Sequence, residues 1–428
     1  MMEMKNSGVD WIGEIPVHWE VKRIKDIAEL GSGTTPKSSN EKYYDDGVHP
    51  WLITGDVQNR LVESNDNFIT NLALAEVPNL KLYPSKTVLL AMYGGGTIGN
   101  VGLMTYPAYI NQACCAMIPK QNVFEKYLFY YLLTKQERIV STGVGGTQIN
   151  LSQNKIAAYP IAIPPLVEQQ AISDYLDEKT AEIDVQVALL EKKRESYNKL
   201  KRSLISKVVT CGLNPAVALK DSGINWIGEI PAHWEVKRLK DVTTLNPNYN
   251  GCDLVGEVSF VPMESLRCGQ IDLQEIEYSE AKGKYTYFGN EDLLVAKVTP
   301  CFENGNIALA KDLKQGVGYG SSEIFVLRSN GILNKYLFYY TLTGNFQGKA
   351  CSTMCGVGGL KRISPLFMRT HQLAIPPIAE QQAIADYLDE KSAEIDGQIV
   401  LIDKKIDTYK KLKRSLIDEV VTGKRKIQ

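Results

Sequence analysis

The stretch "IPPLVEQQAISDYLDEKTAEID" occupies Ile163–Asp184 and returns as "IPPIAEQQAIADYLDEKSAEID" at Ile375–Asp396. Two adjacent prolines suit the start of a helix, where no backbone N–H is needed, but not its interior. Beyond each proline pair, apolar residues recur at every seventh position: Leu176, Ile183, Leu190, Tyr197 and Leu204 in the first copy, and Leu388, Ile395, Ile402, Tyr409 and Leu416 in the second. This spacing predicts two helices of about 40 residues that pair as a coiled coil. An amphipathic helix lying on its own lobe is the alternative.

The order of charges along the two helices predicts the direction of their pairing. Acidic residues dominate 168–184 and basic residues 192–207 in the first helix, and the second repeats this order over 380–396 and 404–414. A parallel pair would place like charges side by side, whereas an antiparallel pair sets acid against base at both ends. Each exposed ion pair contributes only a few tenths of a kcal/mol, but all of them favour the same direction. We therefore expect an antiparallel rod of roughly 60 Å, at ~1.5 Å per residue, with one lobe at each end.

The duplication extends over the whole chain. "WIGEIPVHWEVKRIKD" at Trp11–Asp26 returns at Trp226–Asp241 with 14 of 16 positions identical, and "KYLFYYLLT" at Lys126 returns as "KYLFYYTLT" at Lys335. A period of about 210 residues is far above solenoid lengths and indicates a duplicated domain pair. We expect an α+β fold, with two pseudo-twofold-related mixed α/β lobes separated by a long antiparallel two-helix coiled coil. The expected segments are 1–162 (first lobe), 163–225 (first helix and linker), 226–374 (second lobe) and 375–428 (second helix).

The placement of the W-I-G-E-I-P segments predicts where the chain ends lie. One such segment follows the first helix, whereas the equivalent segment for the second helix stands at the N-terminus. The repeat is therefore cyclic, and we expect the two termini to lie close together. Four of the five tryptophans belong to these segments, so packing is their expected role, with His18 and His233 as core or interface residues.

Composition bounds the class of protein. The chain has 428 residues, 44% of them hydrophobic and 23% charged, and no apolar run near the ~20 residues that a membrane span needs. Its eight cysteines lack metal-ligand spacing, which favours free thiols in a reducing cytoplasm. The four histidines argue against a histidine-rich metal centre, and we expect no metal site.

A glycine-rich stretch, "VLLAMYGGGTIGN" at Val88–Asn100, contains the pattern G-x-G-x-x-G, which is typical of dinucleotide and S-adenosylmethionine sites. In such sites the third glycine opens a helix and an acidic residue follows about 20 positions later. Here no acidic residue occurs between Asn100 and Phe124, and the continuation is rich in β-branched residues. We therefore expect two strands joined by a surface loop, where backbone comes close to a ligand, and no bound cofactor.

The two lobes differ mainly in their loops. "TVLLAMYGGGTIGNVGLM" is opposed by "DLLVAKVTPCFENGNIAL" at Asp292–Leu309, and "LGSGTTPKSSN" at Leu30 by "LNPNYNG" at Leu245. "GVGGTQINLS" at Gly143 is opposed by "GVGGLKRISP" at Gly356. Twin scaffolds that carry different polar loops predict a reader of two different targets at a fixed separation.

The IPP-x-x-EQQ-x-I-x-x-YLD helices, the G-x-x-P loop after the W-I-G-E-I-P-x-H-W segment and the duplicated lobes resemble the specificity subunit of type I restriction–modification enzymes. The resemblance covers essentially the whole chain. It implies that each lobe is a target-recognition domain for one half of a split double-stranded DNA site. It also implies that the helices set the spacer and dock two methyltransferase subunits, with restriction/translocase subunits completing an endonuclease. S-adenosylmethionine, ATP and Mg²⁺ would then belong to the partner subunits, and the chain alone would not be catalytic.

The residues agree with a non-catalytic chain. "NPNY" at Asn246–Tyr249 lacks the second proline of the N/D-P-P-aromatic motif of adenine methyltransferases, and no P-loop is present. Asp292 and Lys297 are an isolated pair rather than a nuclease cluster. A structural adaptor whose two lobes bind proteins rather than DNA is the competing interpretation.

Charge is the difficulty for a DNA reader, because DNA-binding domains are usually basic. Residues 1–162 carry 14 Lys and Arg against 15 Asp and Glu, and residues 226–374 carry 15 against 15. We expect basic residues to gather on one face and partner subunits to supply further charge. The candidate base or phosphate contacts are Thr34, Thr35, Lys37, Tyr93, Gly95, Thr97, Gln148 and Asn150 in the first lobe, and Asn248, Lys297, Thr299, Asn304, Asn306, Lys361 and Arg362 in the second. For each one, a solvated loop residue is the alternative.

Overall fold

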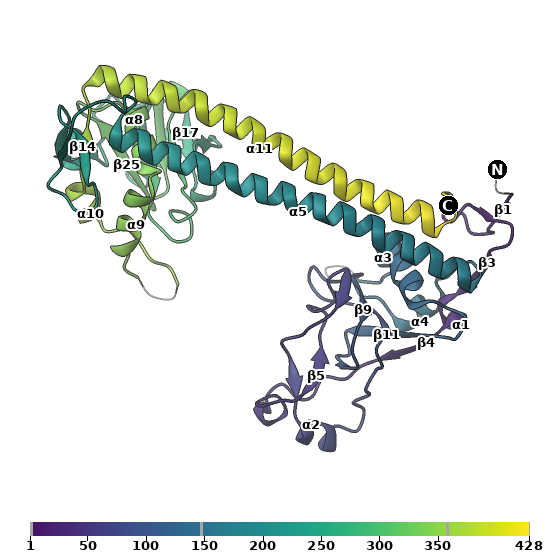
Figure 1. Ribbon diagram of the computed structural model, residues 1–428. Helices are drawn as coiled ribbons and strands as arrows, with labels where there is room; N and C mark the ends of the chain where they lie inside the picture. Colours follow the sequence, from purple (N-terminus) through teal and green to yellow (C-terminus); the bar gives the residue numbers. More distant parts are fainter. Residues whose placement is uncertain (1–2, 146–148, 357–358, 428) are drawn as a thin grey trace. The chain divides into compact units, whose positions relative to one another are not determined.

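A computed structural model describes residues 3–145, 149–356 and 359–427 of the chain. It divides into two compact units, which are residues 1–190 together with 404–428, and residues 191–403. Each unit contains one lobe, the beginning of the helix that follows this lobe and the end of the other long helix (Figure 1). The compact units therefore cut across the four segments expected from the sequence, because both long helices are shared between them.

The two long helices are α5 (Leu166–Cys211) and α11 (Ile378–Val421), each beginning directly after its proline pair. In the second unit, Arg194 of α5 pairs with Asp403 of α11 at 3.1 Å, and Lys201 pairs with Asp396 at 2.7 Å. Seven residues forward along α5 thus correspond to seven residues backward along α11, which makes the pair antiparallel. In the first unit, Lys413 of α11 pairs with Asp184 of α5 at 2.6 Å. The expected antiparallel pairing of acidic and basic segments is confirmed.

The seven-residue stripe lies along the facing sides of these helices. Its buried members are Leu176, Ile183, Leu388, Ile395, Ile402 and Leu416, and its half-buried members are Leu190, Tyr197, Leu204 and Tyr409. At the helix ends, additional apolar residues such as Ile205 and Val209 of α5 join the core of the second lobe. Both interpretations of the apolar stripe therefore hold. Each long helix pairs with the other helix along its middle and packs on a lobe at its ends.

The first lobe is built on a five-stranded sheet in the order β4-β11-β8-β9-β6, with a smaller sheet in the order β10-β5-β7. In Figure 1 the smaller sheet and α2 lie at the end of the lobe away from α5, whereas α3 lies between the larger sheet and α5. The bounds are Ala28–Ser32 (β4), His49–Leu52 (β5), Arg60–Val62 (β6), Phe68–Ile69 (β7), Asn71–Glu76 (α2), Val88–Ala91 (β8), Val101–Met104 (β9), Tyr109–Ile110 (β10), Cys114–Pro119 (β11), Glu125–Ser141 (α3) and Gln153–Ala158 (α4).

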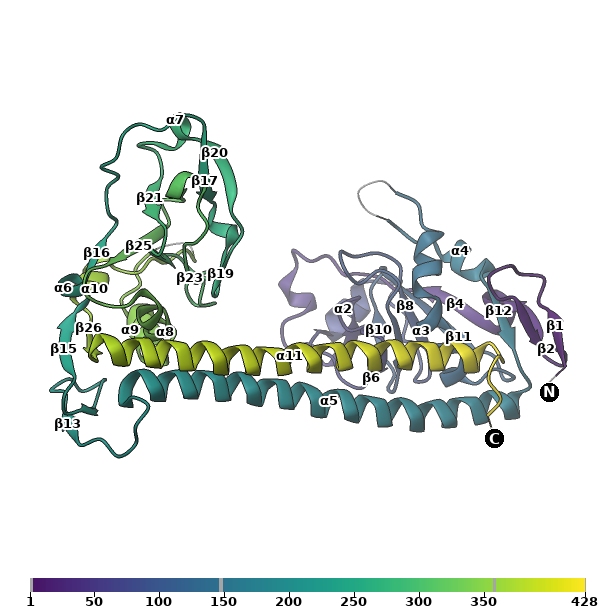
Figure 2. The ribbon, with the colours of Figure 1, turned by 90° about the horizontal axis from the view of Figure 1, so that it is seen from above.

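The second lobe repeats this plan with a four-stranded sheet, β16-β25-β22-β23, and a second four-stranded sheet, β20-β17-β24-β21. Figure 2 shows the second of these sheets at the end of the lobe away from the long helices. The bounds are Thr243–Leu245 (β16), Glu257–Val261 (β17), Leu266–Arg267 (β18), Gln270–Ile271 (β19), Gln274–Glu277 (β20), Tyr278–Ala281 (α7), Thr286–Gly289 (β21), Leu293–Ala296 (β22), Ile307–Leu309 (β23), Val317–Gly320 (β24), Ile324–Ser329 (β25) and Pro365–Thr370 (α10).

The two lobes differ at the helix that follows the central sheet. The first lobe has one helix, α3, where the second has α8 (Asn334–Thr341) and α9 (Gly344–Ser352). The break comes at Thr343, whose hydroxyl accepts a hydrogen bond from the backbone N–H of Phe346 and so caps a new helix. In the first lobe, Thr134 stands at the equivalent position and is followed by Lys135, which continues the helix.

The W-I-G-E-I-P segments attach each lobe to the helix ends. They contribute the paired strands β1 (Met4–Asn6) with β2 (Glu14–Pro16), β3 (Glu20–Arg23) with β12 (Pro160–Ile163), β13 (Leu219–Asp221) with β14 (Glu229–Pro231), and β15 (Glu235–Arg238) with β26 (Gln372–Ile375), and the short helices α1 (Ile24–Ile27) and α6 (Leu239–Val242). Trp19 and Trp234 are buried, and their indole N–H groups donate to Glu168 and Glu380 at 3.1 Å. Their expected packing role is confirmed.

The chain ends meet in the first unit. A Cβ placed on Gly423, just beyond α11, would lie 2.4 Å from Pro16 and 3.3 Å from Trp19, so the N-terminal segment packs directly on the end of α11. The expected proximity of the termini is confirmed. His18 and His233 lie at the surface, where they bond Glu168 at 2.8 Å and Glu380 at 2.7 Å.

Candidate nucleic-acid interface

The divergent loops of the first lobe meet at one end of its central sheet. Strand β4 ends with Ser32 opposite Cys115 of β11, and β8 ends with Ala91 opposite Cys114. The loop after β4, the glycine-rich loop after β8 and the turn before β11 therefore share this edge. The segment leading into Leu151 joins them, because the N–H of Leu151 donates to the carbonyl of Met92 at 2.8 Å. Neighbouring strands thus bring the candidate segments of the first lobe together.

The loop after β4 is held by its threonines. The hydroxyl of Thr34 donates to the Asn79 carbonyl at 3.0 Å, and its N–H donates to the Ile110 carbonyl at 3.0 Å. The hydroxyl of Thr35 donates to the amide oxygen of Gln112, an exposed residue in the turn before β11 that was not among the candidates. Its place directly before a buried strand was the available signal. Thr34 thus shapes the loop, while Lys37 and Gln112 present polar groups to solvent.

The glycine-rich loop joins two antiparallel strands, β8 and β9, as expected. Gly99 has a φ of 82°, and a Cβ there would lie 2.5 Å from the Val140 side chain of α3. Because a strand rather than a helix follows, the loop does not offer the helix N-terminus that cradles phosphates in nucleotide sites. Its residues therefore do not fit a dinucleotide or S-adenosylmethionine.

Individual candidates in this loop differ in accessibility. Gly95 is exposed and Tyr93 is half-buried, with its ring packed on the lobe core. The hydroxyl oxygen of Thr97 is buried and lies where a side chain on Gly94 would be, 2.5 Å from its Cβ position. Thr97 is therefore not available to a ligand, contrary to the expectation. Asn150 is exposed and forms an isolated bridge with Val144. Gln148 lies outside the described residues.

The second lobe assembles its divergent loops at the corresponding end of its sheet. Strand β16 ends with Leu245 opposite Leu327 of β25, and β22 ends with Ala296 opposite Ile324. The backbone N–H of Thr299 donates to the Lys361 carbonyl at 3.0 Å, and the Thr299 hydroxyl accepts from the Lys361 N–H at 3.0 Å. These hydrogen bonds connect the loop after β22 with the loop before α10, although the two loops lie far apart in the sequence. Thr299 is buried, so its role is to hold this junction.

The cations of the second lobe are mostly engaged within it. Arg362 forms a bidentate ion pair with Glu323, whose pKa is lowered by this guanidinium. The Lys297 ammonium donates to the Ser322 carbonyl at 2.6 Å and lies 4.6 Å from the centre of the Phe325 ring, and burial lowers its pKa. Lys361 is exposed, as are Asn248 and Asn304, whereas Asn306 is buried.

The structure also bears on other classes of function. Within the described ranges, no group of three or more His, Cys, Asp or Glu residues could hold a metal ion. All eight cysteines are free. Among the helices that the structure describes, none is long and apolar enough to span a membrane. The exposed candidate side chains, which are Lys37, Asn150, Asn248, Asn304, Lys361 and the ion-paired Arg362, offer amide and cationic groups.

Comparisons with known proteins were made for the whole chain. A family model described as the type I restriction modification DNA specificity domain matches residues 16–192 and 231–400. The type I restriction enzyme EcoAI specificity subunit of Escherichia coli is 35% identical over 161 residues, which are 36% of this chain but only 27% of that protein. The putative type I restriction enzyme MjaX specificity subunit of Methanocaldococcus jannaschii is 26% identical over 97% of this chain and 96% of that protein.

One solved structure shares the fold. It comes from work on complex assembly and conformational transition of the type I R-M system, and it superimposes with a TM-score of 0.71. The alignment covers 95% of this chain and 98% of that chain at 14% sequence identity.

Proposed function

The chain belongs to the type I restriction modification DNA specificity family, and from this premise we propose that it is the DNA-recognition subunit of a type I restriction–modification complex in the cytoplasm. Each lobe reads one half of a bipartite, asymmetric double-stranded site. The observation that carries the proposal is the repetition of one scaffold with different loops at the same end of its sheet. A protein that bound one ligand twice would have kept the loops alike.

The two interfaces offer different chemistry. The first presents the amide of Gln112, the exposed backbone of Gly95 and the ammonium of Lys37. The second presents the amides of Asn248 and Asn304 and the ammonium of Lys361. Amides can read base edges, and lysines can contact phosphates without reading sequence. Because these sets differ, the two halves of the DNA site are expected to differ as well.

The attachment of each lobe to the helix ends supports a spacer role for the helices. In the first unit, the buried hydroxyl of Tyr127 lies 2.7 Å from the Ala162 carbonyl and 3.0 Å from the Val421 carbonyl at the end of α11. In the second unit, Tyr336 bridges Ala374 at 2.9 Å and Val209, near the end of α5, at 3.1 Å. A lobe fixed to both helices changes position when a helix changes length.

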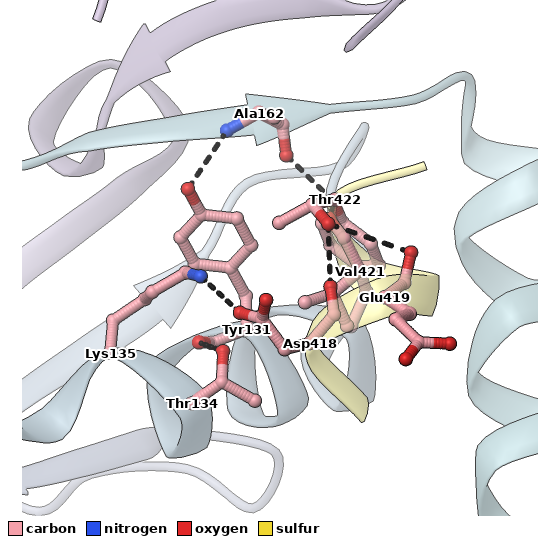
Figure 3. A network of polar contacts seen from close by, with 9 residues as sticks. Tyr131, Thr134, Lys135, Ala162, Asp418, Glu419, Val421 and Thr422 are labelled. Atoms are coloured by element: carbon pink, nitrogen blue, oxygen red, sulfur yellow. Dashed lines mark hydrogen bonds and ion pairs between the residues drawn. The ribbon is translucent and has the colours of Figure 1, made fainter. Parts of the chain in front are cut away.

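The first unit adds a charged contact to this junction. Lys135 of α3 forms an ion pair with Asp418 of α11, and the Lys135 side chain is only 9% exposed (Figure 3). The hydroxyl of Tyr131 accepts a hydrogen bond from the Ala162 N–H at 3.4 Å beside this pair. The junction between the first lobe and α11 therefore contains directional polar contacts in addition to apolar packing. Such contacts restrict the orientation of the lobe on the helix more than apolar packing alone would.

Two methyltransferase subunits are the proposed partners on the helices. Two copies of one partner need the same surface twice, and the repeat preserves an exposed face with one-turn spacing. This face consists of Gln170, Asp174 and Glu178 on α5, and of Gln382, Asp386 and Glu390 on α11. S-adenosylmethionine is then held by these partners, and ATP and Mg²⁺ by restriction/translocase subunits where these join. The chain itself supplies recognition and is not catalytic alone.

Exchange of one lobe tests the proposal. Residues 27–160 are replaced by the first lobe of another family member, and methylated sites are mapped by sequencing after co-expression with the methyltransferase subunit. One half-site should change, while the other half and the spacing stay. Insertion of residues into α5 and α11 should instead change the spacing, by a helix rise of ~1.5 Å per residue against ~3.4 Å per base pair. An altered second half-site after the lobe exchange would contradict modular reading.

DNA affinity separates this function from a protein adaptor. The lobes are nearly neutral, and Arg362 and Lys297 are engaged within the chain. We therefore expect weak DNA binding by the chain alone and selective binding with the methyltransferase partner, measured at one salt concentration. No selective binding in either case would favour the adaptor.

A further inference from the structure

A recess of about 490 Å³ opens on the second lobe beside its candidate interface. Its wall includes Asn246 and Asn248 from the divergent loop after β16, and the rest comes from Tyr249, Lys282, Tyr285 and the strands β21 and β24. Figure 2 shows β21 in the sheet that lies away from the long helices, and β24 pairs with it. The recess therefore adjoins the proposed DNA-reading surface of the second lobe through Asn246 and Asn248.

Four tyrosines form a closed cycle of ring contacts in this region. Tyr249 contacts Tyr278 and Tyr287 with ring centres 6.2 and 5.1 Å apart, and Tyr319 contacts the same two rings at 6.1 and 6.0 Å. Tyr285 packs edge-on against Phe260 at 4.8 Å and stays 38% exposed. Burial raises the pKa of Tyr319 to about 12, so its phenol is uncharged. The recess thus lies over a packed tyrosine core, in which Tyr278 and Tyr319 are buried, and the exposed ring of Tyr285 stands at its rim.

A buried ion pair braces this surface from behind. The Arg328 guanidinium donates to both carboxylate oxygens of Asp292, at 2.9 and 2.6 Å, and Asp292 is 2% exposed. The same guanidinium lies 5.2 Å from the centre of the Tyr287 ring. Since Asp292 also accepts from the Gly289 N–H at 2.7 Å, Tyr287 is held on a rigid base. A surface built this way is ordered before any ligand arrives.

We propose that this tyrosine recess binds one nucleobase of the target DNA after that base has left the double helix. The inference rests on the proposed function, and it adds a stacking site to the reading of base edges. Aromatic side chains stack on any base, and such stacking offsets the free energy of unpairing. The amide of Asn248 at the wall can bond the edge of the base, and the exposed Lys284 can contact a phosphate, whereas Lys282 is ion-paired with Asp253.

The test uses the complex of the full chain with its methyltransferase subunit and its mapped DNA site. Methylation of that site by the wild-type complex comes first, so failure of the proposed function is seen separately. 2-Aminopurine, whose fluorescence rises when it leaves the stack, then replaces each base of the second half-site in turn. We expect a rise at one position besides the adenine that is methylated, which the methyltransferase subunit itself extrudes, and this second rise should be lost in Tyr285→Ala and kept in Tyr285→Phe. DNA affinity should fall roughly five- to hundred-fold in Tyr285→Ala.

Tyr109→Ala serves as the matched control, because Tyr109 is a half-buried aromatic residue on the small sheet of the first lobe. It should leave the fluorescence signal unchanged. The thermal unfolding midpoint of each variant shows that the lobe is intact. The proposal is overturned if no position besides the methylated adenine responds in an active wild-type complex, or if this second response survives in Tyr285→Ala. It is also overturned if Tyr285→Ala weakens binding of the methyltransferase subunit without DNA, which would identify a protein-docking surface.

Discussion

His371 gives a sharp test of the core of the second unit. It is 5% exposed and packs among the rings of Trp226, Tyr340, Phe346 and Phe367. Burial, with the nearby charge of Lys349 as a smaller cause, lowers its pKa to about 4 from an ordinary value of 6.5. The imidazole is therefore neutral in the folded chain at pH values where it would be charged in the unfolded chain.

The sign of the effect follows from linkage. Above pH 6.5 the side chain is neutral in both states, so its full contribution to stability is present. Between pH 6.5 and about 4, only the unfolded state takes up the proton, and the free energy of unfolding falls by about 1.4 kcal/mol per pH unit. The loss levels off at about 3 kcal/mol below this window.

The substitution His371→Phe isolates this contribution. At pH 7 the variant should be less stable by about 1 kcal/mol, because the Tyr340 hydroxyl loses its bond to the imidazole. The phenyl ring of the variant does not bind a proton. The free energies of unfolding of the wild type and the variant should therefore be equal at about pH 6, and the variant should be the more stable protein below this pH. Urea unfolding of both proteins, followed by tryptophan fluorescence across this range, measures the difference and cancels the titration of the carboxylates.

The first lobe provides the control for this comparison. Tyr159 occupies the equivalent place, against Trp11 with ring centres 5.0 Å apart. It does not ionise in this range, because the ordinary tyrosine pKa of 10.0 already lies above it and burial raises the pKa of Tyr159 further. Tyr159→Phe should therefore give a curve parallel to that of the wild type. A constant difference between the wild type and His371→Phe from pH 7 down to about 4 would refute the reasoning, since it would mean that His371 titrates alike in both states.

Three further substitutions or truncations are informative. Lys135→Ala should lower the free energy of unfolding of the first unit by about 2 kcal/mol, measured by urea unfolding, because it leaves Asp418 without its partner. Gly99→Ala should cost about 2 kcal/mol in the same assay, since its backbone φ is positive and α3 crowds it, whereas Gly95→Ala should cost less than about 0.5. A chain cut near Cys211 should form a twofold dimer by light scattering and direct methylation of a palindromic site, and a stable monomer would contradict antiparallel pairing.

The long helices could be predicted from the sequence because their signals are local. The heptad positions of α5 and α11, the proline pairs before them and the order of charges each involve neighbouring residues. The convergence of the loops could be predicted in part, since loops after paired strands share a sheet edge. The limits of the compact units could not be predicted in this way. The first unit combines residues 1–190 with residues 404–428, and this combination depends on contacts between segments that are far apart in the sequence.

Other features depend on contacts between residues that are far apart in the chain. The closed cycle of tyrosines needs the parallel pairing of β17 with β24, and no local pattern marks Tyr278 and Tyr319 as neighbours. Thr97 looked available in a glycine-rich loop, yet the turn folds its hydroxyl inward. Thr299 looked like a ligand contact but holds two loops together instead. Loop composition thus predicts where an interface lies better than which residues face outward.

The ion pair between Lys135 and Asp418 has no counterpart in the second unit, where Gly344 and Ser206 stand at the equivalent positions. The last turns of α5 and α11 are otherwise similar in sequence. The end of an α5 helix from another copy could therefore pack on the first lobe in place of the end of α11. With a contribution of about 2 kcal/mol, the pair favours the end of α11 over the end of α5 by about 30-fold. One charged contact therefore gives a duplicated chain a way to tell its two halves apart, so that the protein closes on itself rather than exchanging segments with another copy.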